Sequence, residues 1–260
     1  HDGGTAVTTL DLTPSAAAPP SRRPIAAQTA MEAKLILRNG EQLLLTIAIP
    51  VALLVLFAKA PIANIPKPRI DFMTPGVLGL AVMSTAFTGQ AIGTGFERRY
   101  GVLRRLATTP LSRAGLLSAT TVAVFAVEVL QTALLCVVAA LLGWHPHGSV
   151  APVIGLLVLG TATFSALGLL MAGTLRAEAT LAGANLFYLL SLGLGGVAYP
   201  LSDYSHTVQD ILGLLPLTAL SGGLRAVLDH GGGVPVHDWL TLLVWAAVGI
   251  GAAVRWFRWD

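Results

Sequence analysis

The stretch ERRYGVLRRLATTPLSR, residues 97–113, holds five arginines and one glutamate, although the whole chain has only 16 lysine and arginine residues. It lies between two long apolar runs, residues 72–96 and 114–144. Such a dense group of charges cannot lie in hydrocarbon, because one charged side chain at the centre of a spanning helix already costs about 3 kcal/mol. The pattern therefore predicts a short polar helix at one membrane face, between two membrane-spanning helices.

The composition of the chain predicts an integral membrane protein. Hydrophobic residues make up 54% of the 260 residues, charged residues only 11%, and the mean hydropathy is +0.74. A soluble domain carries about 25% charged residues, because its surface must face water. No basic patch interleaved with aromatic residues occurs outside the membrane flanks, which argues against nucleic-acid binding.

The chain divides into a tail and one membrane domain. Residues 1–24 are rich in Ala, Pro, Thr and Ser and show no hydrophobic period, so we expect a disordered tail. Residues 25–260 form the membrane domain. At its start, residues 25–42 mix apolar and charged side chains, which predicts a helix lying in the membrane interface. A solvated helix leading into the first span is the alternative.

The apolar runs predict an all-α, polytopic fold with six transmembrane helices. One crossing needs about 20 apolar residues, and the runs closest to this requirement are residues 43–57, 72–96, 114–143, 150–175, 179–199 and 239–257. Residues 208–228 are also apolar but are broken by Pro216 and by Gly222-Gly223. We therefore predict two short re-entrant helices before the last span, with a seventh span as the alternative.

The distribution of basic residues predicts the orientation. With six spans, the two termini, residues 97–113 and residues 176–178 share one face, which carries twelve of the lysines and arginines. The opposite face carries four, namely Lys59, Lys67, Arg69 and Arg225. By the positive-inside rule, the first face is cytoplasmic. Both termini are therefore expected in the cytoplasm, in a multi-pass protein of the cell membrane.

Three motifs carry a family resemblance. Residues 97–113 combine an acidic residue, a Gly-Val-Leu step, basic residues and a Thr-Pro-Leu-Ser-Arg ending. Residues 215–225 read LPLTALSGGLR, and Tyr199-Pro200 ends the predicted fifth span. In these positions the motifs resemble those of ABC-2-type transporter permeases, and most of all the actinobacterial drug-resistance exporters of the daunorubicin-resistance kind.

The resemblance implies an architecture and a set of partners. Such a permease has six spans, an interfacial N-terminal helix, a coupling helix between spans two and three, and re-entrant helices between spans five and six. It dimerises with a second copy or a related permease, and it binds two copies of a cytoplasmic ATP-binding subunit that holds ATP and magnesium. The segment that resembles the re-entrant helices contains Pro200, Pro216 and Arg225.

ATP hydrolysis is not expected of this chain, because it lacks a G-x-x-x-x-G-K-[ST] loop. We therefore predict a permease and not an enzyme, with no cofactor bound by the chain itself. The residues predicted to couple it to the ATPase are Glu97, Arg98, Arg99, Tyr100, Gly101, Leu103, Arg104, Arg105 and Pro110. In this hypothesis Glu97 starts the coupling helix and Pro110 ends it. Alternatively, the arginines only fix the topology and bind anionic lipid headgroups.

A few polar residues inside the predicted spans are candidates for a translocation pathway or for helix packing. Glu128 is the one acidic residue in mid-span, and Gln131 lies three positions later on the same helix face. Asn185 and Tyr188 are one turn apart in the fifth span. Glu128 could contact a cationic drug, or a hydrogen bond from it could tie helices together. The scattered histidines do not predict a metal site.

These observations predict an ATP-driven exporter whose cargo is lipophilic drugs or lipid-like molecules. A polysaccharide or glycolipid exporter of the same fold is the alternative. A secondary transporter would need several mid-span acids, and a membrane-embedded enzyme would need a cluster of His, Asp and Glu. The sequence shows neither pattern.

Overall fold

The computed structural model describes the backbone of residues 40–59, 68–102, 113–197 and 199–257, and the side chains of residues 46–59, 68–102, 120–197 and 199–257. Every regular element in this part of the chain is a helix, which confirms the predicted all-α class. The predicted disordered tail and the predicted interfacial helix lie almost wholly outside the described residues.

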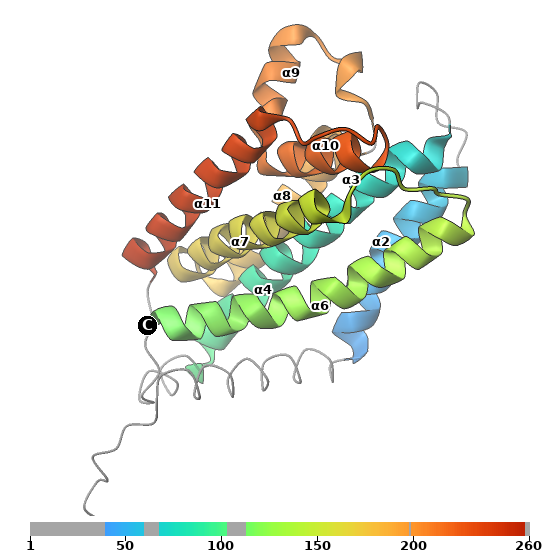
Figure 1. Cartoon of the computed structure of the whole chain (residues 1–260). Coiled ribbons are helices and arrows are strands. Elements are labelled where there is room, and N and C mark those ends of the chain that lie inside the picture. The colour runs from blue at the N-terminus through green and yellow to red at the C-terminus, as the bar shows by residue number, and fades with distance from the viewer. Residues whose placement is uncertain (1–39, 60–67, 103–112, 198, 258–260) are drawn as a thin grey trace, which may run out of the picture.

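The helices form one bundle (Figure 1). Its long members are α2 (Gly40–Lys59), α3 (Arg69–Met83), α4 (Gln90–Arg99), α6 (Arg113–Leu141), α7 (Val150–Thr174), α8 (Ala177–Leu194) and α11 (Val236–Trp256). The π-helical segment η1 (Ser84–Gly89) joins α3 to α4. The shorter elements η2 (Leu201–Asp203), α9 (His206–Gly213) and α10 (Pro216–Leu228) lie between α8 and α11.

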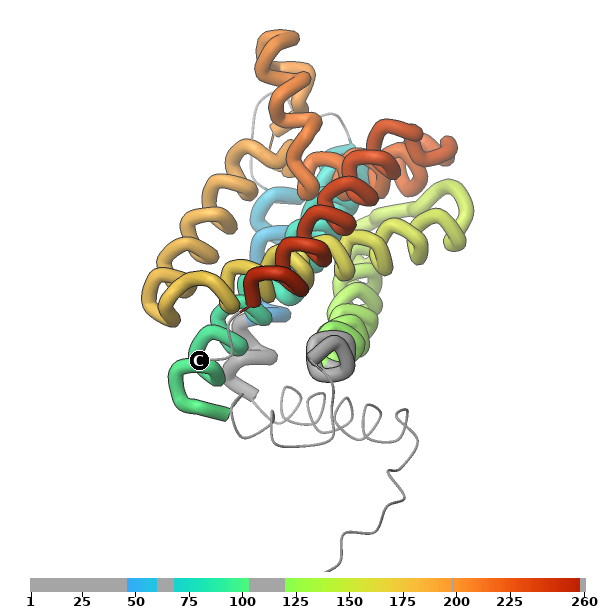
Figure 2. The backbone as a smooth tube through the Cα atoms, turned by 90° about the vertical axis from the view of Figure 1, so that its left-hand side faces the viewer, coloured from blue at the N-terminus to red at the C-terminus, as the bar shows by residue number. Residues whose placement is uncertain are grey.

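Among the residues that the structure describes, five helical stretches are long and apolar enough to cross a membrane: residues 69–99, 120–141, 150–174, 177–194 and 236–256. They correspond to the second to sixth predicted spans. The predicted first span corresponds to α2, whose described side chains, Thr46–Lys59, form a shorter apolar helix. Figure 2 shows how the long helices run side by side between the two ends of the bundle.

The apolar segment before the last span is bent and not straight. Helices α9 and α10 meet at 96°, and Pro216 occupies the first turn of α10. A Cβ atom added to Gly195, just after α8, would lie 2.8 Å from Leu217 in the first turn of α10. Nη2 of Arg225, in the last turn, donates to the carbonyl of Gly196 at 3.0 Å. Because both ends of α10 meet the same turn, α10 lies across one end of the bundle, as predicted for a re-entrant pair.

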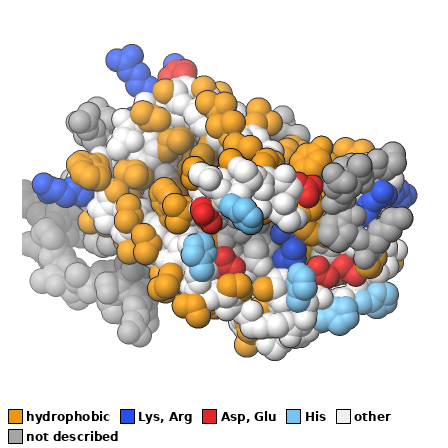
Figure 3. Space-filling model, turned by 90° about the horizontal axis from the view of Figure 1, so that it is seen from above, with side chains coloured by type: hydrophobic (Ala, Val, Ile, Leu, Met, Phe, Trp, Pro, Cys, Tyr) orange, Lys and Arg blue, Asp and Glu red, His pale blue; other side chains and the backbone are white. Residues whose placement is uncertain are grey.

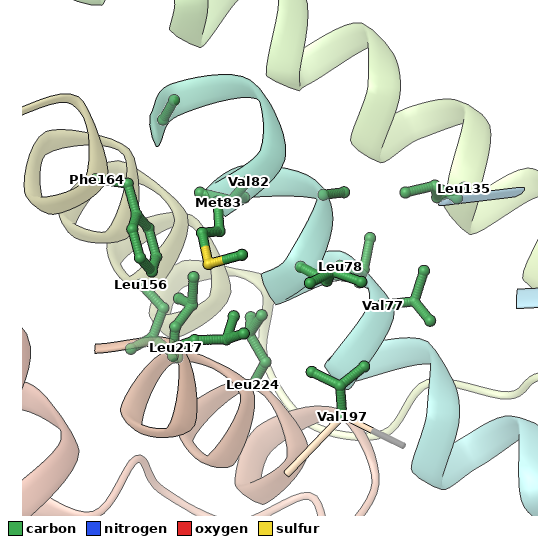
Figure 4. Packing of buried hydrophobic residues seen from close by; sticks show 14 of the residues in the cluster. Val77, Leu78, Val82, Met83, Leu135, Leu156, Phe164, Val197, Leu217 and Leu224 are labelled. Carbon is green, nitrogen blue, oxygen red and sulfur yellow. The ribbon is translucent and has the colours of Figure 1, made fainter. Parts of the chain in front are cut away.

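The second span, residues 69–99, forms the centre of the bundle. In its most apolar 18-residue window, 89% of the window is buried inside the bundle, whereas the corresponding share is 22–50% in the other four stretches. Met83 of this span lies among side chains from α7 and α10, whereas Val77 lies on the side of α3 that holds Leu135 of α6 (Figure 4). The second span therefore forms the hydrophobic core, and the other helices keep one face exposed.

Several predicted boundaries are wrong by three to five residues, and two of them have a clear local cause. Helix α8 ends at Leu194 and not at 199, because Gly195 caps it and Gly196 turns the chain with a φ of 69°. Helix α11 begins at Val236, three residues before the predicted start, since Pro235 precedes it in extended geometry. Apolar composition continues past the end of α8, whereas the polar residues His237 and Asp238 lie inside the first turn of α11, so hydropathy alone misplaces both boundaries.

The close approach of α7 to η1 gives a stability test. A Cβ atom added to Gly168 would lie 2.8 Å from the carbonyl oxygen of Phe87, whereas one added to Gly251 would meet nothing within 4 Å. We expect Gly168→Ala to destabilise the purified protein by about 1–3 kcal/mol through overpacking. Gly251→Ala, in an exposed part of α11, is the control and should be neutral or stabilising. Equal melting temperatures in detergent for the two variants would contradict this packing.

Candidate functional site

The charged stretch begins as the end of the second span. Helix α4 continues through Glu97, Arg98 and Arg99, and Tyr100 caps it. The amide of Gly101 donates to the carbonyl of Arg98 at 3.1 Å, and Gly101 has a φ of 72°. The hypothesis that Glu97 starts a separate coupling helix is therefore wrong. Gly101 ends α4, because glycine adopts a positive φ without a steric penalty. The change from apolar to charged residues at Glu97 does not end the helix.

Arg98 and Arg99 fasten the end of α4 to the link between α7 and α8. Nη2 of Arg98 donates a hydrogen bond to the carbonyl of Leu175, and Arg99 forms an ion pair with Glu178. The side chains of Arg99 and Glu178 are 51% and 62% exposed, so the pair contributes at most about 1 kcal/mol. These arginines thus have contacts within their own chain, besides any contact with a partner.

A polar hollow lies between the end of α4 and the start of α8. Its volume is about 520 Å³, and it is lined by Gly95, Arg98, Arg99, Tyr100, Gly101, Arg176, Ala177 and Glu178. Tyr100 stacks on Phe96 with ring centroids 6.2 Å apart, yet it is 69% exposed. Val102 is exposed as well. The hollow therefore presents three arginines and an exposed aromatic ring to whatever covers this end.

The other predicted coupling residues are only partly described. Leu103, Arg104, Arg105 and Pro110 lie outside the described residues, and so does most of the predicted coupling helix. Glu97 is half-buried on the last turn of α4 and makes an interaction in the structure.

Glu128 and Gln131 are both buried in α6, but they contact different neighbours. Thr161 of α7 donates a hydrogen bond to Oε2 of Glu128. Oε1 of Gln131 accepts from Thr85 of η1 at 2.9 Å, and its Nε2 donates to the carbonyl of Thr46 in α2 at 2.8 Å. Gln131 thus links three helical segments, whereas Glu128 reaches only α7 among the described residues.

Asn185 and Tyr188 lie on a helix that the bundle covers on one side only. Asn185 is exposed, and Tyr188 is half-buried. The hydroxyl of Tyr188 has no hydrogen-bond partner among the described residues. Their neighbour Phe187 packs on Phe87 of η1, with ring centroids 4.8 Å apart. Asn185 therefore points away from the described core, and its role stays a prediction.

The three residues of the predicted re-entrant segment each fix a local geometry. Pro200 is buried and precedes η2, and Pro216 opens α10, where its missing N–H costs nothing. The guanidinium of Arg225 lies 3.8 Å from the ring centroid of Phe72 and donates to the carbonyl of Phe72 at 3.3 Å. Arg225 thereby ties α10 to the first turn of α3.

The end of the bundle that carries α9 and α10 presents several histidine and acidic side chains (Figure 3). His145, His147, His206, His230 and His237 are all exposed. Within the described ranges, no three His, Cys, Asp or Glu side chains come together in a way that could hold a metal ion.

The contact between α4 and the α7–α8 link was missed by sequence reasoning. Residues 176–178 were assigned to the same membrane face as residues 97–113, but nothing in the sequence paired Arg99 with Glu178. The available signal was weak. Arg176 and Glu178 interrupt two apolar runs, on the face that also holds the arginine-rich stretch. The charge balance of that face could have suggested an ion pair, although not its partners.

The comparison with known families agrees with this architecture. A family model described as ABC-2 type transporter matches residues 25–228, more than three quarters of the chain. A search of curated proteins found no match.

The ion pair between Arg99 and Glu178 can be measured by a double-mutant cycle. We expect Arg99→Glu and Glu178→Arg each to lower thermal stability slightly, and the double swap to recover most of the loss. The coupling free energy should be below about 1 kcal/mol and should fall as salt is added, since the pair is exposed. Strictly additive effects at low salt would show that the two side chains do not interact.

Proposed function

The chain belongs to the ABC-2 type transporter family and is a transmembrane permease of that family; we propose that it exports lipophilic drugs or lipid-like molecules. Permeases of this kind lack ATPase activity and pair with separate ATP-binding subunits. Two such subunits, carrying ATP and magnesium, would drive a pair of permeases formed with a second copy or a related chain. Both termini would then lie in the cytoplasm, and the exporter would confer drug resistance of the daunorubicin-resistance kind.

The polar hollow between α4 and α8 is the observation that carries the coupling part of this proposal. Exposed aromatic and arginine side chains are the residue types that dominate protein–protein contacts. Tyr100 supplies such a ring, and Arg98, Arg99 and Arg176 surround it. Anionic lipid headgroups would also suit the arginines, but they would not need the exposed ring beside a positive-φ glycine.

Contacts inside the bundle support a route from this hollow to the helices. A displacement of Tyr100 by the ATP-binding subunit would move the end of α4. Through Arg98 and Arg99 it would also act on Leu175 at the end of α7 and Glu178 at the start of α8. The same span continues through η1 into α3, where Gly79 lies against Leu217 and Ser221 of α10. One continuous helix therefore joins the proposed ATPase contact to the opposite end of the molecule.

The side chains of the described interior support a lipophilic cargo over a glycan. Buried polar groups are mainly hydroxyls, and several of them donate to carbonyls of their own helix, such as Thr74 to Ile70 at 2.7 Å. Hydroxyls paired in this way are not free for a sugar chain, although other buried polar atoms, such as both amide atoms of Gln90, have no partner among the described residues. A polysaccharide or glycolipid exporter is the alternative within the same fold, and ATP-independent secondary transport is a weaker one because it would call for more mid-span acids.

The direct test is reconstitution of the chain with its ATP-binding partner in vesicles. ATP-dependent movement of a lipophilic dye, with ATPase stimulation by lipophilic compounds and none by oligosaccharides, is expected. Stimulation by oligosaccharides alone would favour the alternative cargo. Transport driven by a proton gradient without ATP would overturn the exporter mechanism.

Tyr100 tests the proposed contact with the ATPase. Because its ring is 69% exposed, Tyr100→Ala should leave the fold intact. We expect about a tenfold loss of affinity for the ATP-binding subunit, as for an interface residue whose truncation costs more than about 1 kcal/mol. Leu141→Ala is the matched control, since Leu141 is 82% exposed at the other end of the bundle. Equal co-purification of the partner with both variants would refute the contact.

Glu97 and Gly101 test coupling apart from assembly. Alanine at Gly101 would be strained by roughly 1–2 kcal/mol at positive φ, and Glu97→Gln removes a charge while keeping the side-chain shape. We expect both variants to insert in the membrane and to retain the partner but to lose stimulation of ATP turnover by cargo. Gly93→Ala, where a Cβ atom meets nothing within 4 Å, is the control. Normal transport by the Glu97 and Gly101 variants would count against coupling at this turn.

A further inference from the structure

A second hollow lies at the other end of the bundle, between α6, α7 and the segment that connects them. Its volume is about 630 Å³. The α6 side runs from Phe125 to Cys136, three turns or roughly 16 Å at 1.5 Å per residue. Leu228, the last residue of α10, lines it as well. The hollow is therefore an elongated groove that follows α6 from mid-span toward the end carrying α10.

The walls of the groove are apolar and open to the side. Val129, Val150 and Ile154 line it and are 55%, 70% and 54% exposed. In a membrane such exposed valines and isoleucines face lipid chains. A lipophilic molecule could thus enter the groove from the bilayer without passing through water.

Two buried polar atoms in the groove lack partners. Glu128 is 3% exposed, and its Oε1 has no hydrogen-bond partner in the part of the chain that the structure describes. Nε1 of Trp144, a residue that is 5% exposed, is likewise without a partner there. Leaving a buried polar group unsatisfied is costly, so a ligand that hydrogen bonds to it would be favoured. His147, the histidine in the lining, is exposed.

The groove also has a fixed cover at its end. The amide of His147 donates to the carbonyl of Leu228 at 2.9 Å, and Gly148 has a φ of 78°. A Cβ atom added to Gly148 would lie 2.5 Å from the carbonyl oxygen of Val227. The connecting segment is thus held against α10, so the groove is closed at this end and open along α6 and α7.

We propose that the groove between α6 and α7 binds a lipophilic amine, whose apolar body lies along α6 and whose N–H donates to Oε1 of Glu128. A cationic or neutral amine supplies the donor that Oε1 lacks, and a bond in which one partner is ionised belongs to the strong, charge-assisted kind. This inference deepens the proposed function by naming an amine-bearing class of lipophile. It concerns binding to the membrane domain alone, so it needs neither ATP nor a partner subunit.

Cys136 provides a built-in reporter, because it lines the groove and is the one cysteine of the chain. The full chain in lipid nanodiscs is treated with a lipophilic maleimide, with or without dodecylamine. We expect dodecylamine to slow the labelling of Cys136 about tenfold or more when the amine fills the groove. Dodecanol at the same membrane concentration should protect Cys136 much less. Equal protection by the alcohol would overturn the preference for an amine.

Variants separate the carboxyl from the rest of the groove. Glu128→Gln should raise the dodecylamine concentration needed for half-protection about tenfold, since the charge-assisted bond is lost. Asp203→Asn, an exposed acid in η2, should leave it unchanged. Unchanged protection in Glu128→Gln would overturn the proposal, even if ATP-driven export is established.

A second variant guards against misfolding of Glu128→Gln. Ala133 lines the groove and is exposed, so Ala133→Trp should fill the groove without disturbing the core. It should abolish binding of a dansyl-labelled alkylamine, followed by its fluorescence, while Glu128 is retained. Wild-type binding by Ala133→Trp would place the amine elsewhere in the protein or in the lipid and would refute the groove as its site.

Discussion

The structure depends on the requirement that a helix inside a bilayer satisfies its own backbone hydrogen bonds, because hydrocarbon offers no water to do so. The second span, residues 69–99, meets this requirement at the centre of the bundle, despite Pro75 within α3 and the π-helical segment in its middle. Its side chains are buried on nearly all sides, and the other helices pack around it. This explains why those helices can keep an apolar face toward lipid while the bundle still has a core.

Polar side chains in the spans follow from the same requirement. Thr74 and Thr174 donate to carbonyls four residues earlier in their own helix, at 2.7 Å each, and so satisfy their hydroxyls without a partner helix. Gln131 cannot satisfy its longer amide in this way, and it links α6 to α2 and η1 instead. The presence of polar residues in a membrane helix is therefore no sign of a transport pathway until their partners are known.

Features that depend on a few neighbouring residues could be predicted from the sequence, and features that depend on contacts between distant residues could not. Hydropathy predicted the helical spans, and Pro216 predicted the break before α10, because both act over a few neighbouring residues. The end of α4 was predicted wrongly, since the positive φ of Gly101 and not the charge of Glu97 ends the helix. The pairing of Arg99 with Glu178 joins residues 79 positions apart. Such a contact depends on how whole helices pack, and it cannot be predicted from a single sequence.

The π-helical segment is where a movement of the second span would be distributed to other helices. A π turn has a looser backbone than an α-helix and often occurs where function needs an adjustable geometry. Here it touches α6 through the hydrogen bond of Thr85 with Gln131, α7 through the close approach of Gly168 to Phe87, and α8 through Phe187. With η1 in the middle, a change at the α4 end can alter the packing of three neighbouring helices, including both that line the groove beside Glu128.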